Sequence, residues 1–126
     1  MTPSTLSPRE YHARREQESR DDREALRLLT LAEVRAAIRR RAPEFPPVRA
    51  VYLFGSVVEP GRFHAASDID IAVDCEDIEV ETPFCRALEA DLHRDVDLRP
   101  REGPIAQAVE DLGEKVYERE VPAPGA

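Results

Sequence analysis

The hydrophobic positions of the chain alternate between a helical interval and short continuous runs. Apolar residues recur at helical spacing over 31–38 and again over 105–112, which predicts one buried helix face in each segment. Between them lie two short apolar runs rich in β-forming residues, 48–54 and 69–73, which predict buried strands. This alternation of helices and strands indicates an α/β domain.

Local signals along the chain predict where the helices begin. Ser7-Pro8-Arg9-Glu10 combines a capping serine, a proline at the first helical position and a glutamate three residues after the cap. Thr30-Leu31-Ala32-Glu33 is a second capping box and predicts that a new helix begins there and ends before Pro43. Thr82-Pro83 predicts the start of a third helix that continues to about His93.

The C-terminal third completes the expected fold. A short strand is predicted over 95–98, a helix from Gly103-Pro104 with Gly113 as its C-cap, and a short edge strand over 115–118. We therefore expect an α/β (α+β) fold with a small mixed sheet of three or four strands flanked by helices. The expected divisions are a charged N-terminal arm or helix over 1–29, a single domain over 30–118 and a flexible tail over 119–126.

Charge narrows the classes of function. The net charge of -8 is uneven, because residues 1–42 carry ten Arg against seven acidic residues (+3), which leaves -11 on residues 43–126. The main body therefore has no basic stripe, and we expect no direct binding of nucleic acid. An acidic body suits a protein that recruits divalent cations or docks a basic partner. No apolar run approaches the ~20 residues of a membrane helix and no secretory signal is present, so we expect no membrane association and a cytoplasmic location.

Four aspartates form the candidate chemistry. Residues two apart in a strand share a face, so Asp68 and Asp70 should lie side by side, as should Asp95 and Asp97 on the later strand. Carboxylates gathered on neighbouring strands repel one another, and a hard divalent cation relieves that repulsion. Two such ions can assist an in-line phosphoryl or nucleotidyl transfer.

A glycine and a serine follow the first predicted strand. Gly55-Ser56 comes directly after the apolar run and is expected to open a helical turn. Such a turn offers backbone N–H groups and a hydroxyl to a phosphate, and glycine permits close approach. The pair alone occurs in many turns by chance, so it gains meaning from Asp68-Ile69-Asp70 about a dozen residues later.

Together these motifs carry a family resemblance. The stretch FGSVVEPGRFHAASDIDIAV with the later DVDL resembles the minimal nucleotidyltransferases of the DNA polymerase beta superfamily, over roughly residues 30–118. The resemblance implies that Gly55 and Ser56 hold the terminal phosphates of a nucleotide. It implies that Asp68 and Asp70 ligate two Mg²⁺ ions. Asp97 best matches the third metal-binding carboxylate and general base, and Asp95 is the competing choice.

One departure concerns the loop between the two motifs. Eleven residues separate Ser56 from Asp68, whereas ten is the commoner spacing of the family. A surface loop accommodates one more residue at little cost, but whether the longer loop keeps activity stays open. Arg62 and His64 within it are candidate phosphate contacts or plain surface residues, and Ser67 is expected to hydrogen-bond locally before Asp68.

The resemblance also implies a reaction and a partner. Members of the family transfer a nucleotide monophosphate to a hydroxyl and release pyrophosphate, with ATP as the default substrate. The chain is expected to hold little beyond the catalytic core and an arm, so the acceptor should come from elsewhere. The first hypothesis is an antitoxin that transfers AMP to a tyrosine of a small helical HEPN-type toxin. The alternatives are an aminoglycoside-like nucleotidyltransferase of small molecules and a catalytically silent antitoxin that acts by binding. A homo- or hetero-oligomer is compatible with each.

Overall fold

The computed structural model describes residues 5–120 as three α-helices, two 3-10 turns and one four-stranded sheet. The elements in chain order are α1 (Pro8–Arg41), η1 (Ala42–Glu44), β1 (Val48–Phe54), η2 (Gly55–Val58), β2 (Ile69–Cys75), α2 (Ile78–Leu92), β3 (Val96–Pro100), α3 (Gly103–Leu112) and β4 (Glu114–Glu118). The sheet order is β3-β2-β1-β4, with β2 and β3 parallel and the other pairs antiparallel. The predicted mixed sheet flanked by helices is confirmed.

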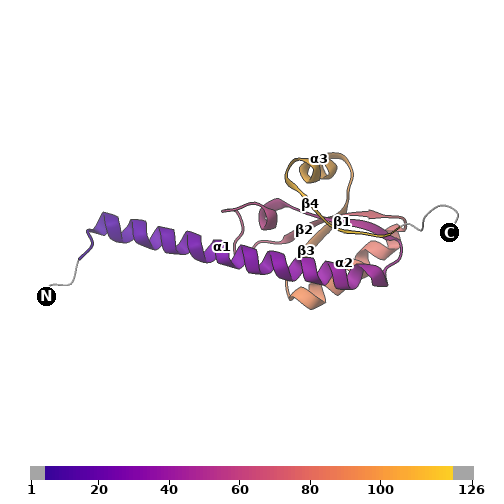
Figure 1. Cartoon of the computed structure of the whole chain (residues 1–126), viewed down its shortest axis with the longest axis horizontal. Coiled ribbons are helices and arrows are strands. Elements are labelled where there is room, and N and C mark those ends of the chain that lie inside the picture. The colour runs from indigo at the N-terminus through magenta and orange to yellow at the C-terminus, as the bar shows by residue number, and fades with distance from the viewer. Residues whose placement is uncertain (1–4, 121–126) are drawn as a thin grey trace.

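The helices cover the sheet unequally. In Figure 1, α1 and α2 lie on one side of the sheet and α3 lies on the other. The core forms under α1 and α2, where Val34, Ile38, Leu53, Ile71 and Phe84 are fully buried. Each such side chain contributes about 2 kcal/mol by leaving water. No residue of α3 is buried, so α3 covers the opposite face of the sheet only in part, and polar side chains can lie on that face.

Helix α1 differs from its prediction. Its start is confirmed, since Ser7 Oγ accepts the Glu10 N–H (3.1 Å) and a Glu10 carboxylate oxygen accepts the Ser7 N–H (3.2 Å). The second helix start at Thr30 is wrong, because Thr30 is buried inside one continuous helix. The segment before it holds strong helix formers and no glycine or proline, so the backbone has no reason to break. The first half of α1 is exposed and projects beyond the sheet (Figure 1).

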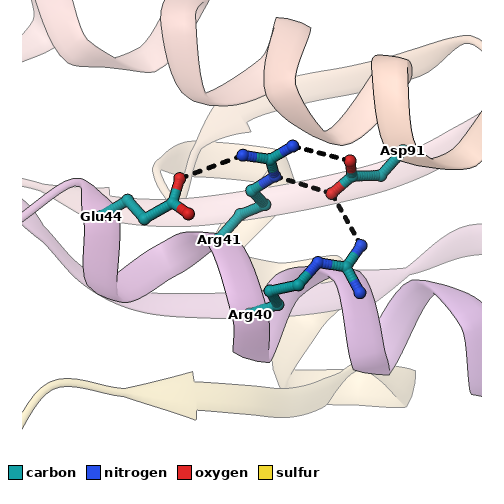
Figure 2. A network of polar contacts seen from close by, with 4 residues as sticks. All are labelled: Arg40, Arg41, Glu44 and Asp91. Carbon is teal, nitrogen blue, oxygen red and sulfur yellow. Dashed lines mark hydrogen bonds and ion pairs between the residues drawn. The ribbon is translucent and has the colours of Figure 1, made fainter.

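The end of α1 is fastened to α2 by a cluster of ionic hydrogen bonds (Figure 2). Arg41 donates through Nε and Nη2 to the two carboxylate oxygens of Asp91, at 2.8 Å each. Arg40 donates to the same carboxylate at 2.8 Å, and Arg41 also reaches Glu44 at 3.1 Å. The two arginines hold the pKa of Asp91 well below its usual range. This cluster ties the two helices that cover the core.

Two further boundaries correct the predictions. Helix α2 begins at Ile78, not at Thr82, because the Asp77 side chain caps it by accepting the Glu79 N–H at 3.0 Å. Pro83 lies inside the helix, where it costs one hydrogen bond near the first turn. Strand β3 begins at Val96, one residue later than expected, and extends to Pro100.

The remaining elements follow their predictions. β1 has the bounds expected for it, β2 extends two residues beyond, α3 starts at Gly103 and ends with Gly113 as C-cap, and β4 is an edge strand. The division of the chain at residues 29 and 30 stays a prediction, although α1 runs through it. Residues 121–126 of the expected tail lie outside the described part of the chain. Within that part, no helix has the length and apolar character of a membrane span.

Candidate active site

Three acidic residues meet at one end of the sheet. Because β2 and β3 are parallel, Asp70 lies directly opposite Asp97 in the strand register. Asp68 stands just before β2 and is exposed, whereas Asp70 and Asp97 are half-buried. The structure therefore places three of the four aspartates that the sequence pattern singled out at one end of the sheet, on the face that α3 covers only in part.

The competing aspartate occupies a different place. Asp95 lies before β3 and is exposed, and its backbone carbonyl accepts the Ile69 N–H at 3.1 Å. Asp97, not Asp95, is the register partner of Asp70. This geometry favours Asp97 as the third carboxylate, while its chemical role stays a prediction.

The backbone conformation of Gly55 lets this residue lie against the carboxylate of Asp70. β1 ends at Phe54, which is the register partner of Asp70 on the antiparallel side. Gly55 follows with φ +75, a conformation that side chains rarely adopt. A Cβ placed there would overlap a carboxylate oxygen of Asp70. Only glycine allows η2, which also carries Ser56, to begin this close to Asp70.

The charges of the site act on one another. The pKa of Asp70 is raised, first by its burial and then by repulsion from Asp97 and Asp68, while Arg99 lowers it. Arg99 follows Asp97 by two residues on β3 and donates its Nε–H to Asp97 Oδ1 at 3.0 Å. Asp70 is thus repelled by two other carboxylates, whereas Asp97 accepts a hydrogen bond from an arginine.

The donor set fits a magnesium ion in its chemistry. All three side chains offer carboxylate oxygens, the ligands that hard divalent cations prefer, and a cation would relieve the repulsion that raises the pKa of Asp70. In the described residues, however, no group of three or more acidic, histidine or cysteine side chains is arranged as a metal site. Arg99 holds the carboxylate of Asp97 in this arrangement.

The longer loop between the two motifs is well anchored. Phe63 is 1% exposed and enters the core, and the Arg94 guanidinium lies 5.1 Å from its ring centroid. Arg94 also donates to the backbone carbonyls of Ala65 and Ser67, at 3.0 Å each, directly before Asp68. The additional residue therefore does not leave the segment that leads into Asp68 unsupported.

Smaller contacts order the same loop. The local hydrogen bond predicted for Ser67 is confirmed, since its Oγ accepts the His64 N–H at 3.1 Å. Arg62 is exposed and pairs with Glu59 at 3.4 Å, and the His64 ring accepts the Ala66 N–H. A phosphate contact by Arg62 or His64 stays a prediction.

Sequence reasoning missed three arginines near the site. Arg99 could have been predicted, because residues two apart on a strand share a face and Asp97 was already a candidate. Arg94 and Arg27 could not, since their partners are backbone carbonyls far away in sequence. The one hint in the sequence was the position of Arg27, which lies at helical spacing from the buried Leu31 and Val34.

The fold is that of a class of enzymes, the nucleotidyltransferases. A family model for polymerase beta nucleotidyltransferases matches residues 37–120, more than half of the chain. The chain therefore belongs to the polymerase beta nucleotidyltransferase family, and nucleotidyltransferase is its enzyme class.

Solved structures agree with this family. A crystal structure of a toxin-antitoxin with AMP-PNP contains a chain 30% identical to this one, with a TM-score of 0.56, over 68% of this chain and 74% of that one. Two mutants of the toxin-antitoxin MntA-HpeT are 27% and 29% identical, with TM-scores of 0.55 and 0.51. Those matches cover 68% and 66% of this chain and 74% and 70% of theirs. No curated protein matches the chain significantly.

Proposed function

We propose that this chain transfers AMP from ATP to a hydroxyl group of a protein acceptor, in a reaction that requires Mg²⁺. The observation that carries the proposal is the position of Asp70, which lies between Gly55 and Asp97 at the end of the sheet. The acceptor proposed is a tyrosine of a small helical HEPN-type toxin. Similar chains occur in toxin-antitoxin structures, one of them with AMP-PNP, which supports both the partner and the nucleotide.

Each residue has a role in this proposal. Backbone N–H groups and the hydroxyl at Gly55-Ser56 hold the terminal phosphates, and glycine lets them approach. Asp68, Asp70 and Asp97 would hold two Mg²⁺ ions, which when bound supply positive charge to the phosphates. Asp97 takes the proton of the acceptor hydroxyl. The hydroxyl oxygen then bonds to the α-phosphorus as the bond to the leaving pyrophosphate breaks.

The test is a transfer assay with a small helical protein of the HEPN type, taken from the gene next to that of this chain where such a gene is found. With α-³²P-labelled ATP and Mg²⁺, we expect label on a tyrosine of that protein. Asp97→Asn should reduce the rate about a hundredfold or more. Asp95→Asn is the matched control and should leave it nearly unchanged, because Asp95 does not pair with Asp70. If no label reaches the protein and the two do not co-purify, the proposal fails.

One observation favours a second candidate, an antitoxin that acts by binding alone. Asp97 is engaged by Arg99, and the acidic side chains of the described residues do not converge as a metal site. The two functions separate in cells that express the toxin. Asp70→Asn should lose neutralisation if AMP transfer protects the cell, whereas protection equal to that of the wild type supports binding alone.

A further inference from the structure

Helix α1 contributes a buried arginine next to the nucleotide-binding turn. Arg27 is 7% exposed, and it is the one charged side chain that is buried in the described part of the chain. It lies on the face of α1 that also buries Leu31 and Val34. A buried guanidinium needs partners for its N–H groups, so the positions of those partners show what it does.

The partners of Arg27 lie on η2 and on α1 itself. Its Nη1 donates to the backbone carbonyl of Val57 at 3.1 Å, in a buried hydrogen bond. Its Nε donates to the Glu24 carboxylate at 3.0 Å, and its Nη2 donates to the same group. That carboxylate in turn accepts the backbone N–H of Gly61 at 3.4 Å. One ion pair on α1 thus holds two points of the backbone, Val57 and Gly61.

Those two points lie just beyond the residues proposed to bind phosphate. Val57 belongs to η2, the turn that starts at Gly55 and contains Ser56. Gly61 lies in the turn that follows, within the loop that is one residue longer than the family's commoner spacing. Rotation of η2 about Gly55 would move the N–H groups of this turn away from a phosphate. The bond from Arg27 to Val57 opposes that movement, because a buried carbonyl without a partner is costly.

Apolar packing alone would not place the turn in this way. Replacing a buried charge together with its partner by apolar residues is often neutral for stability, so stability alone does not account for the buried Arg27. Its planar guanidinium fixes direction as well as distance, since its donors lie in a rigid fork. The Glu24 carboxylate raises the pKa of Arg27, and Arg27 lowers the pKa of Glu24, so both stay charged at neutral pH.

We infer that Arg27 and Glu24 are positioning residues that hold the Gly55-Ser56 turn in the orientation that binds nucleotide phosphates. The effect of these residues on the turn rests on the contacts above, and their effect on nucleotide binding rests on the proposed function. It also assigns α1 a role in the site, because the element that supports the turn is the helix whose first half projects from the molecule.

The first arm of the test measures hydrogen–deuterium exchange in the full chain without nucleotide. In Arg27→Met, the backbone amides of residues 56–59 and 61 should exchange about tenfold faster than in the wild type, because the turn opens locally. Arg35→Met is the matched control. Arg35 pairs from the same helix with Glu114 at 2.5 Å, so its loss should affect β4 and leave residues 56–61 unchanged. Equal exchange of residues 56–61 in the two variants overturns the inference.

The second arm measures binding of α,β-methylene-ATP with Mg²⁺, a nucleotide whose α–β linkage cannot be cleaved. Arg27→Met should raise the Kd about tenfold or more, Arg27→Lys should restore part of the affinity, and Arg35→Met should match the wild type. Glu24→Gln offers a milder variant in case Arg27→Met does not fold, with an intermediate effect expected in both arms. An unchanged Kd in folded Arg27→Met and Glu24→Gln overturns the inference.

The two arms separate this inference from the proposed function. A wild-type chain that binds no nucleotide refutes the proposed function, and the exchange arm then decides alone whether Arg27 holds the turn. A wild-type chain that binds nucleotide, together with an Arg27→Met variant that exchanges and binds as Arg35→Met does, refutes only the positioning role.

Discussion

Asp70 is in an unfavourable position for a carboxylate without a bound cation. It is half-buried, lies opposite Asp97 on the neighbouring strand and lies against Gly55. Burial and repulsion raise its pKa, so the folded chain holds the proton of Asp70 more tightly than the unfolded chain does. Carboxylates whose pKa is shifted in this way are common at functional sites.

The first prediction concerns the stability cost of that charge. Because the pKa of Asp70 is raised on folding, its ionisation destabilises the fold as the pH rises past the unfolded-state pKa. Asp70→Asn should therefore raise the melting temperature at pH 7 without metal, by about 3 °C. The gain should shrink as the pH falls toward about 4 and vanish well below it, where the carboxyl is protonated in both states. A melting series that shows no gain at pH 7 contradicts the repulsion described here.

The second prediction tests the approach of Gly55 to Asp70. Gly55→Ala must accommodate both a positive φ and a Cβ that overlaps a carboxylate oxygen, so we expect a loss of roughly 2 to 4 kcal/mol in denaturant unfolding. Gly61→Ala is the matched control. Its φ is also positive, at +82, but a Cβ there meets nothing within 4 Å, and a cost of about 1 kcal/mol is expected. Similar losses in the two variants would argue against a tight fit at Gly55.

Single elements show why some boundaries follow from sequence and others do not. β1 and α3 were predictable, because β1 is a short apolar run and α3 has a clear helical period, and each is bounded by glycine or proline. The capping box at Thr30 was misleading, because a local motif cannot end a helix that its neighbours favour and that the core at Val34 and Ile38 supports. Pro83 misled in the same way, since the Asp77 cap places the start of α2 earlier.

The third prediction concerns the junction of α1 and α2 in Figure 2. Asp91 has its pKa lowered on folding, first by Arg41 and then by Arg40, so its contribution is present above the unfolded-state pKa and is lost as the pH falls. Asp91→Asn should lower the midpoint of urea unfolding at pH 7. The difference from the wild type should persist to about pH 4 and shrink at lower pH. A difference that does not change down to pH 2 would show that packing, not charge, makes this junction.

At the scale of the whole molecule, the candidate site joins residues that sequence could name with residues it could not. Strand periodicity predicted the pairs Asp68 with Asp70 and Asp95 with Asp97, and only the family resemblance favoured Asp97, which the strand register places opposite Asp70. The arginines that support the site were not predictable. Arg27 donates to a backbone carbonyl 30 residues away in the sequence, and Arg94 donates to carbonyls 29 and 27 residues away. Contacts of that range depend on how helices dock on the sheet, which no local pattern specifies.

The central claim is that the acidic end of the sheet binds a nucleotide together with Mg²⁺. The most direct test is calorimetric titration of α,β-methylene-ATP into the full chain, with and without Mg²⁺. We predict binding that depends on Mg²⁺ and a Kd at least about tenfold higher in Asp68→Ala and in Asp70→Ala. Asp95→Asn, the control on the same edge, should bind as the wild type does. Nucleotide affinity that is unchanged in both alanine variants would contradict the assignment of the site.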